Sequence, residues 1–305
     1  MTQPEDRAPF GRLLTAMVTP FAADGALDLD GAQRLAAHLV DVERNDGLVV
    51  SGTTGESPTT SDEEKDRLLR AVVEAVGDRA SVVAGVGTND TAHTVHLAQA
   101  AEKAGADGLL VVTPYYNRPP QAGLLAHFRT VADAAGLPAM LYDIPGRTGA
   151  EIGTDTLLRL AEHPRIVAVK DAKDSLPASA VVLARTDLAY YSGTDALNLP
   201  LLSVGAVGFV SVVAHVAGSR LRELLDAWAA GDTAGARAVN AGLLDLYQGI
   251  FRTQGVILTK AALRLAGLPA GPVRAPLVDA TEEQVDQLRT DLAAGGITLP
   301  ADATA

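Results

Sequence analysis

The sequence of 305 residues contains no cysteine. This absence excludes disulfide bonds, thiolate metal ligands and cysteine nucleophiles. A chain without disulfides suits a reducing compartment, and the first nine residues hold no apolar segment of the kind found in a secretory signal. We therefore expect a cytoplasmic protein.

Positive charge is also scarce. Lys and Arg together number 25 against 37 Asp and Glu, which gives a formal net charge of −12. Nucleic acids and anionic membrane surfaces are bound through clustered Lys and Arg side chains. The charge balance therefore disfavours both as partners and favours small-molecule substrates.

One long stretch, residues 199–218, carries no charged side chain and has the length of a membrane span. Pro200, Gly205 and Gly208 interrupt it, however. We predict a short helix followed by a buried strand there, and no membrane association.

A metal-binding pattern is not recognisable either, because the histidines fall mostly on predicted helices without convergent carboxylates. The six are His38, His93, His96, His127, His163 and His215. We expect no metal ion in this protein.

With 48% hydrophobic residues, the chain can bury a large core, and its apolar runs recur with helical segments between them. The starts of these runs lie roughly 20 to 35 residues apart, the spacing of repeated βα units. The runs are 13–20, 47–52, 81–87, 108–114, 138–144, 166–172, 189–193 and 208–213. Eight such units, with no G-x-G-x-x-G turn after the first, predict a (β/α)8 TIM barrel rather than an open dinucleotide-binding sheet.

Helix ends are recognisable in two of the segments between runs. Ser61 and Glu64 form the pattern of a capping box, with Gly77 closing that helix, and Thr91 begins a helix that ends at Gly105. After residue 231 the pattern changes to helices alone, predicted at 232–249, 253–266 and 281–293. We therefore predict a barrel over residues 1–231 and a small C-terminal helical appendage over 232–305.

The active site of such a barrel lies at the carboxyl ends of the strands, which makes Lys170 the most informative residue. It is one of only five lysines and shares a strand face with Ile166 and Ala168. Burial there would depress the pKa of the lysine and leave a neutral amine able to attack a carbonyl. The alternative is a lysine paired with a carboxylate such as Asp171 or Glu56.

Other strand ends are polar as well. The turn at residues 52–56, Gly-Thr-Thr-Gly-Glu, offers backbone N–H groups to a carboxylate, or is an ordinary strand-to-helix turn. Tyr115, Tyr116 and Tyr142 could relay protons or pack at the rim. Arg147 could hold a carboxylate, or be a solvated charge.

Several separated motifs, taken in order, resemble the dihydrodipicolinate synthase family of pyruvate-dependent class I aldolases, which includes N-acetylneuraminate lyase. The motifs are VTPF at 18–21, GTTGE at 52–56, TPYYN at 113–117, LYDIPGRTG at 141–149 and VKDA at 169–172. The resemblance spans residues 11–293, nearly the whole chain.

The resemblance implies catalytic roles for four residues. Lys170 matches the lysine that forms a Schiff base with pyruvate, and Tyr142 matches the acid–base tyrosine beside it. Thr53 and Tyr116 complete the proton relay of the family, with Tyr116 reaching in from a neighbouring subunit of a homotetramer, a dimer of dimers.

Substrate-binding roles follow in the same way. Thr53 and Thr54 would hold the pyruvate carboxylate through their backbone amides, and Gly193 and Val210 would line the pyruvate pocket. Arg147 matches the residue that binds the carboxylate of aspartate semialdehyde.

The implied activity is the condensation of pyruvate with L-aspartate 4-semialdehyde to 4-hydroxy-tetrahydrodipicolinate, in lysine and diaminopimelate biosynthesis. The lysine Schiff base makes a metal or organic cofactor unnecessary. Two alternatives remain open: a sister pyruvate-dependent aldolase or dehydratase acting on a sugar acid or another aldehyde, and an inactive barrel that only binds 2-oxo acids.

Three positions depart from the family pattern. Asp174 stands where the family usually has glycine, and Thr194 replaces the first aspartate of a usual Ser-Gly-Asp-Asp. His93 stands where lysine-inhibited members use a glutamate to bind the effector. We therefore expect weak or no inhibition by lysine.

Overall fold

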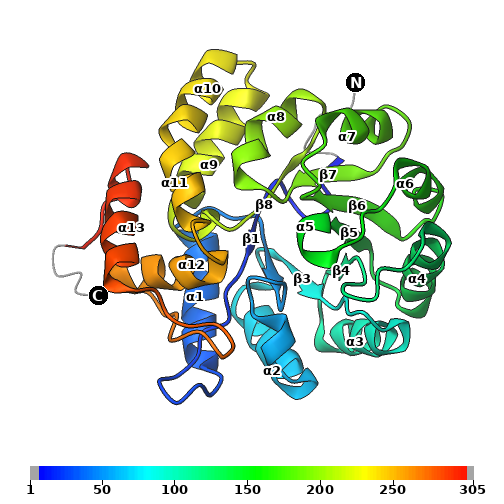
Figure 1. The fold of residues 1–305 in the computed structure, drawn as a ribbon, viewed down its shortest axis with the longest axis horizontal. Coiled ribbons are helices and arrows are strands. Elements are labelled where there is room, and N and C mark those ends of the chain that lie inside the picture. The colour runs from blue at the N-terminus through cyan, green and yellow to red at the C-terminus, as the bar shows by residue number, and fades with distance from the viewer. Residues whose placement is uncertain (1–6, 301–305) are drawn as a thin grey trace.

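The computed structural model describes residues 7–300, which form a closed barrel of eight parallel strands paired in chain order. Figure 1 shows the strands at the centre of a ring of helices. The strands are β1 (Leu13–Ala16), β2 (Gly47–Val50), β3 (Ser81–Gly85), β4 (Gly108–Val112), β5 (Ala139–Asp143), β6 (Ile166–Asp171), β7 (Ala189–Ser192) and β8 (Gly208–Ser211). Each lies inside one of the eight predicted runs, which confirms the TIM barrel.

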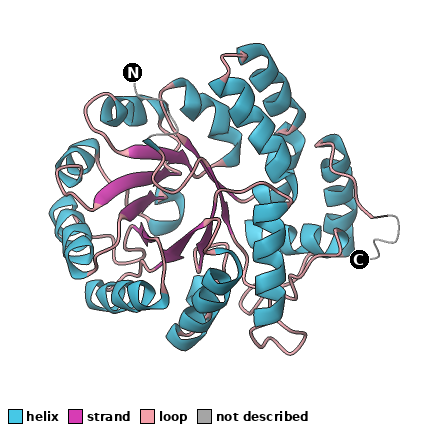
Figure 2. Ribbon diagram, turned by 180° about the vertical axis from the view of Figure 1, so that it is seen from behind, coloured by secondary structure: helices cyan, strands magenta, loops and turns pink. Residues whose placement is uncertain are grey.

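Helices cover the outside of the barrel, as the view from behind also shows (Figure 2). Those of the barrel are α1 (Leu29–Asp41), α2 (Asp62–Val76), α3 (Thr91–Ala104), α4 (Gln121–Ala134), α5 (Pro145–Thr148), α6 (Thr154–Leu160), α7 (Leu176–Leu183), α8 (Asn198–Ser203) and α9 (Ala214–Ala229). Two short 3-10 helices, η2 (Ser57–Thr59) and η3 (Asp195–Leu197), follow β2 and β7.

The predicted helix ends are confirmed. Ser61 and Glu64 form a reciprocal capping box at the start of α2, which satisfies two backbone N–H groups of the first turn. Gly105 ends α3 with a φ of 91°, a left-handed conformation that glycine adopts without steric cost.

Residues 199–218 divide as expected into helix and strand, with α8 leading into β8 and α9 beginning at Ala214. Within residues 7–300, no helix has both the length and the apolar character needed to cross a membrane.

Four helices follow the barrel on one side of the molecule (Figure 1). They are α10 (Thr233–Gly242), α11 (Leu244–Ile250), α12 (Gly255–Leu265) and α13 (Glu282–Ala294). The prediction of one continuous helix over 232–249 is wrong, because the helix is interrupted at Leu243, directly after Gly242. Glycine is a weak helix former, and the break accompanies complete burial of the Leu243 side chain. The division of the chain at residue 231 stays a prediction.

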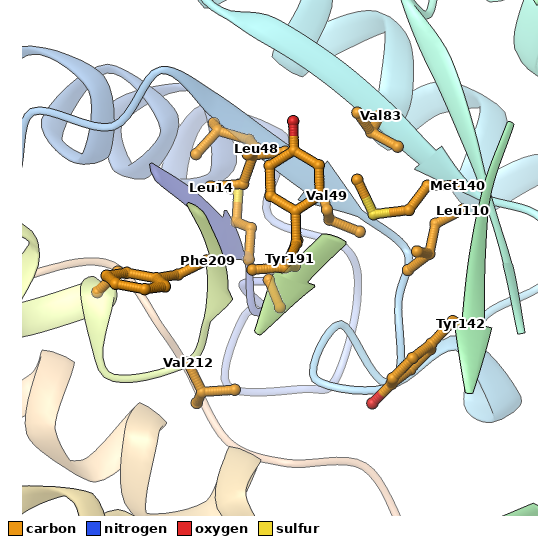
Figure 3. Close-up of a cluster of buried hydrophobic side chains, with 14 of the residues drawn as sticks. Leu14, Leu48, Val49, Val83, Leu110, Met140, Tyr142, Tyr191, Phe209 and Val212 are labelled. Carbon is orange, nitrogen blue, oxygen red and sulfur yellow. The ribbon is translucent and has the colours of Figure 1, made fainter. Parts of the chain in front are cut away.

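Apolar side chains fill the barrel interior, so that it is a packed core and not a pore. Figure 3 shows Tyr142 at one edge of this cluster with its hydroxyl pointing away, whereas the Tyr191 hydroxyl points the opposite way. The Tyr191 oxygen accepts a hydrogen bond from the Phe10 amide at 3.4 Å, at the amino ends of the strands. Tyr142 therefore faces the end of the barrel where the sequence places the site.

The C-terminal segment is anchored to the turn after β2 by a buried ion pair. Lys260 of α12 is fully buried, and its Nζ lies 2.7 Å from Oε1 of Glu56. The same Nζ donates to the Pro272 carbonyl at 2.7 Å, and Oε2 of Glu56 accepts from the Arg274 amide at 2.8 Å. The appendage thus fixes the residue that follows the Gly-Thr-Thr-Gly sequence.

Candidate active site

A cavity of about 400 Å³ opens at the carboxyl ends of β5, β6 and β7, with residues of α11 and α12 on its far side. Of the eight predicted site residues, six line it: Thr53, Thr54, Tyr142, Arg147, Lys170 and Gly193. Side chains more than 100 residues apart in the sequence are thus brought to one site.

Lys170 lies at the closed end of this cavity and is only 4% exposed. Its Nζ is 4.2 Å from the centroid of the Tyr142 ring. Burial lowers the pKa of the Lys170 ammonium from 10.5 to about 7, an effect that the Asp195 carboxylate opposes and the Arg147 cation reinforces. A large fraction of this lysine is therefore the neutral, nucleophilic amine near pH 7.

The alternative of an ion-paired Lys170 is contradicted by the structure. Glu56 pairs with Lys260, and Asp171 accepts hydrogen bonds from the Ser179 hydroxyl and the Lys173 amide. Within residues 7–300, Lys170 forms no salt bridge.

Gly193, at the end of β7, leaves the space that the Lys170 side chain occupies. A Cβ at this position would lie 3.0 Å from Cγ of Lys170 and 3.1 Å from its Cε. The Gly193 amide donates to the Asp171 carbonyl at 2.7 Å, so its backbone cannot easily retreat. A larger residue here would therefore displace the lysine.

Tyr142 pairs in register with Lys170 across β5 and β6. Its phenol is hydrogen-bonded to the Thr53 side chain. Burial raises the pKa of Tyr142 to about 12, while the Arg147 charge and the Thr53 hydrogen bond act in the opposite direction. The phenol is therefore protonated at neutral pH and can donate a proton or a hydrogen bond beside the amine.

The turn that carries Thr53 and Thr54 is held by a hydrogen bond within the turn and by one from the loop after β1. The Gly55 amide donates to the Gly52 carbonyl at 3.0 Å, and the Thr19 hydroxyl donates to the Gly55 carbonyl at 2.6 Å. Within residues 7–300, the amides of Thr53 and Thr54 have no hydrogen-bond acceptor. These two N–H groups are available to a carboxylate in the cavity.

Asp195 is a buried residue of the site to which sequence reasoning gave no role. Its Oδ1 accepts from the Ser211 hydroxyl at 2.5 Å and from the side-chain amide of Asn198 at 3.2 Å. Its Oδ2 accepts from the amides of Val212 and Val213, both at 3.0 Å. Asp195 thus joins the ends of β7 and β8, and its position directly after the polar end of β7 was the available signal.

An ion pair that was not predicted joins the end of β5 to the loop after β6. Lys173 Nζ lies 3.3 Å from Oδ2 of Asp143, and both side chains are buried. Burial raises the pKa of Asp143 to about 6, although the Lys173 charge opposes this. The pair ties together the strand ends that carry Tyr142 and Lys170.

Two predicted residues do not line this cavity. Tyr116 is 90% exposed, has a φ of 72°, and lines an adjoining cavity of about 390 Å³ that shares Thr53, Tyr142 and Arg147. Val210 is fully buried in β8 and is not among the residues lining either cavity, whereas Val212 lines the first.

No group of three or more His, Asp or Glu side chains in residues 7–300 is arranged to hold a metal ion.

Comparison with known proteins gives a consistent result. The model of the dihydrodipicolinate synthetase family matches residues 9–295. The chain is 72% identical over 291 residues to 4-hydroxy-tetrahydrodipicolinate synthase of Acidothermus cellulolyticus, covering 95% of this chain and 94% of that protein. It is 67% identical over 293 residues to 4-hydroxy-tetrahydrodipicolinate synthase 2 of Streptomyces coelicolor, with coverage of 96% and 98%.

A solved structure shares the fold. The enzyme of Cyanidioschyzon merolae with lysine bound superposes with a TM-score of 0.93 at 43% identity, over 95% of this chain and 99% of that one. Because the family model and the relatives both cover nearly the whole chain, this protein belongs to the dihydrodipicolinate synthetase family.

Proposed function

We propose that this protein is a lyase of the 4-hydroxy-tetrahydrodipicolinate synthase type, which condenses pyruvate with L-aspartate 4-semialdehyde in lysine and diaminopimelate biosynthesis. The observation that carries the proposal is the environment of Lys170, a buried lysine without an ion-pair partner in residues 7–300 and with a pKa of about 7. The names of its relatives support the choice of substrates.

The reaction begins when the neutral Nζ of Lys170 attacks C2 of pyruvate and water leaves, which forms an imine. The protonated imine withdraws electrons, so that the methyl group loses a proton and an enamine forms. The enamine carbon attacks the aldehyde carbon of the acceptor, and the aldehyde oxygen takes up a proton. Attack of the acceptor amine on the imine carbon then closes the ring and releases Lys170.

Tyr142 is suited to the proton transfers of this sequence. Its ring lies against the amine, and its hydroxyl has Thr53 as a hydrogen-bond partner, which can pass a proton onward. Tyr116 would complete the relay from a second copy of the chain, because its own side chain is 90% exposed. This role fits assembly into a homotetramer built from dimers.

Two anionic groups need partners in this scheme. The free amides of Thr53 and Thr54 would receive the pyruvate carboxylate, in the cavity that the backbone of Gly193 also lines. Arg147 lines the same cavity and would bind the acceptor carboxylate through two parallel hydrogen bonds.

The proposed chemistry uses no metal ion and no organic cofactor, because the lysine imine itself serves as the electron sink. A reducing, cytoplasmic location is consistent with a chain that contains no cysteine.

Reductive trapping tests the proposal. The protein is incubated with pyruvate and borohydride, and the modified peptide is identified by mass spectrometry; a coupled assay with aspartate semialdehyde follows on the untreated sample. We expect one pyruvate adduct, on Lys170, and turnover of the semialdehyde. Lys170→Met should lose both, whereas Lys103→Met, a change on the exposed face of α3, should lose neither.

Adduct formation and turnover of the semialdehyde test separate parts of the proposal. An adduct without turnover would refute the acceptor, and the absence of an adduct would refute the Schiff base itself.

A further inference from the structure

Two of the residues that depart from the family pattern contact each other in the structure. Asp174 lies in the loop after β6, and Thr194 lies in the turn after β7. The Thr194 hydroxyl donates to Oδ1 of Asp174 at 2.9 Å. Both residues line the cavity that holds Lys170. Asp174 thus brings a carboxylate to the rim of this cavity, and Thr194 holds one of its oxygens.

Asp174 has a φ of 61°, in the left-handed region that favours glycine. Aspartate tolerates this conformation better than most residues, but at some cost. Its side chain is exposed, whereas Lys170 is buried. The Asp174 carboxylate therefore lies at the open rim of the cavity and Lys170 at its closed end.

Two of the five charged residues that line the cavity are already occupied by protein partners. Asp195 accepts four hydrogen bonds, two at each carboxylate oxygen. Lys173 is paired with Asp143. Among described residues, Oδ2 of Asp174 has no hydrogen-bond donor. Of the two carboxylates that line the cavity, only Asp174 thus has an oxygen free to bind a ligand.

We propose that Asp174, held in place by Thr194, determines acceptor specificity by binding the ammonium group of the aldehyde substrate. This inference rests on the proposed function, whose acceptor carries an ammonium and a carboxylate on the same carbon. Arg147 and Asp174 line one cavity and offer opposite charges to these two groups. An acceptor without the ammonium group gains nothing from Asp174.

The test compares two aldehydes with the same carbon skeleton. L-Aspartate 4-semialdehyde is the substrate, and succinic semialdehyde, which lacks the amino group, serves as a competitive inhibitor. The proteins are wild type, Asp174→Asn, Thr194→Val and Asp187→Asn. Asp187 lies on the surface before β7, at the other end of the barrel, and controls for the change in net charge.

For Asp174→Asn we expect the KM for aspartate semialdehyde to rise about 5- to 10-fold, as for loss of a solvent-accessible, charge-assisted contact. The KM for pyruvate, the yield of the trapped adduct and the inhibition constant of succinic semialdehyde should stay unchanged. Thr194→Val should give a smaller rise in the same KM, and Asp187→Asn no change.

If Asp174→Asn weakened the binding of both aldehydes equally, the inference would be overturned, because the residue would then shape the cavity without contacting the ammonium group. An unchanged KM for aspartate semialdehyde would overturn it as well. If the wild-type protein forms the pyruvate adduct and does not turn over aspartate semialdehyde, the proposed function itself fails.

Discussion

Imine formation at Lys170 should depend on pH in a way that an ordinary lysine cannot produce. With a pKa of about 7, half of the Lys170 side chains are neutral at pH 7. A lysine with the usual pKa of 10.5 would be neutral in only about 0.03% of molecules at that pH. Burial thus raises the concentration of the reactive amine on the order of 10³-fold.

The rate of adduct formation with pyruvate, trapped by cyanoborohydride between pH 5.5 and 9, should therefore rise roughly 15-fold from pH 5.5 to pH 7. It should level off above about pH 8, where nearly all of the amine is neutral. Intact-mass analysis of quenched samples measures the rate directly.

Arg147→Met provides a directional check. The Arg147 cation lowers the pKa of Lys170, so its removal should move the midpoint of the profile to higher pH. The scheme assigns Arg147 to the acceptor, and hence the plateau rate with pyruvate alone should be retained. A wild-type midpoint at pH 9 or above, or a shift to lower pH in the variant, would refute the electrostatic argument.

Further predictions concern stability, catalysis and regulation. Lys170→Met should raise the free energy of unfolding at pH 7 by up to about 5 kcal/mol. This gain should shrink between pH 7 and 10, because in that range the unfolded wild-type chain binds a proton that the native wild type does not. Thermal unfolding of both proteins from pH 7 to 10 measures the difference. Lys260→Met should cost about 3–5 kcal/mol by leaving Glu56 buried and unpaired, and Glu56→Gln in the same chain should recover much of the loss; no recovery in the double variant would contradict the ion-pair account. Tyr142→Phe should lower kcat about 10²- to 10⁴-fold with the pyruvate adduct retained, as expected of a proton-transfer group; an unchanged kcat would remove Tyr142 from the mechanism. His93 lies 2.8 Å from Asp62 and offers no carboxylate to an effector, so sub-millimolar lysine should not inhibit in a steady-state assay, and strong inhibition would refute this.

The strands of the barrel could be predicted because their signal is local. A parallel strand covered on both faces needs a continuous apolar run, and each run carries that signal in a few residues. The break between α10 and α11 was missed for the opposite reason. Gly242 alone does not end a helix, and the burial of Leu243 depends on the packing of residues distant in the sequence.

Partners in the site were hard to predict because they are distant in sequence. The contact between Glu56 and Lys260 spans more than 200 residues, and the sequence offered Glu56 instead as a partner for Lys170. Contacts at neighbouring strand ends, such as that of Asp143 with Lys173 in the loop after β6, depend on the register of the sheet. The residue types at the strand ends were enough to predict where the site lies. Which charged side chains form ion pairs there depends on the folded structure.

This distinction is clearest among the lysines themselves. Lys170, Lys173 and Lys260 all have buried side chains, so burial by itself does not identify a nucleophile. Lys173 and Lys260 each have a buried carboxylate as a dedicated partner, Asp143 and Glu56 respectively. Lys170 has instead an aromatic ring and an arginine nearby, while Asp195, the carboxylate that acts on it, is bound by four other donors. Burial lowers the pKa of Lys170, and the lack of a dedicated counter-ion leaves that effect in place and makes this one lysine reactive.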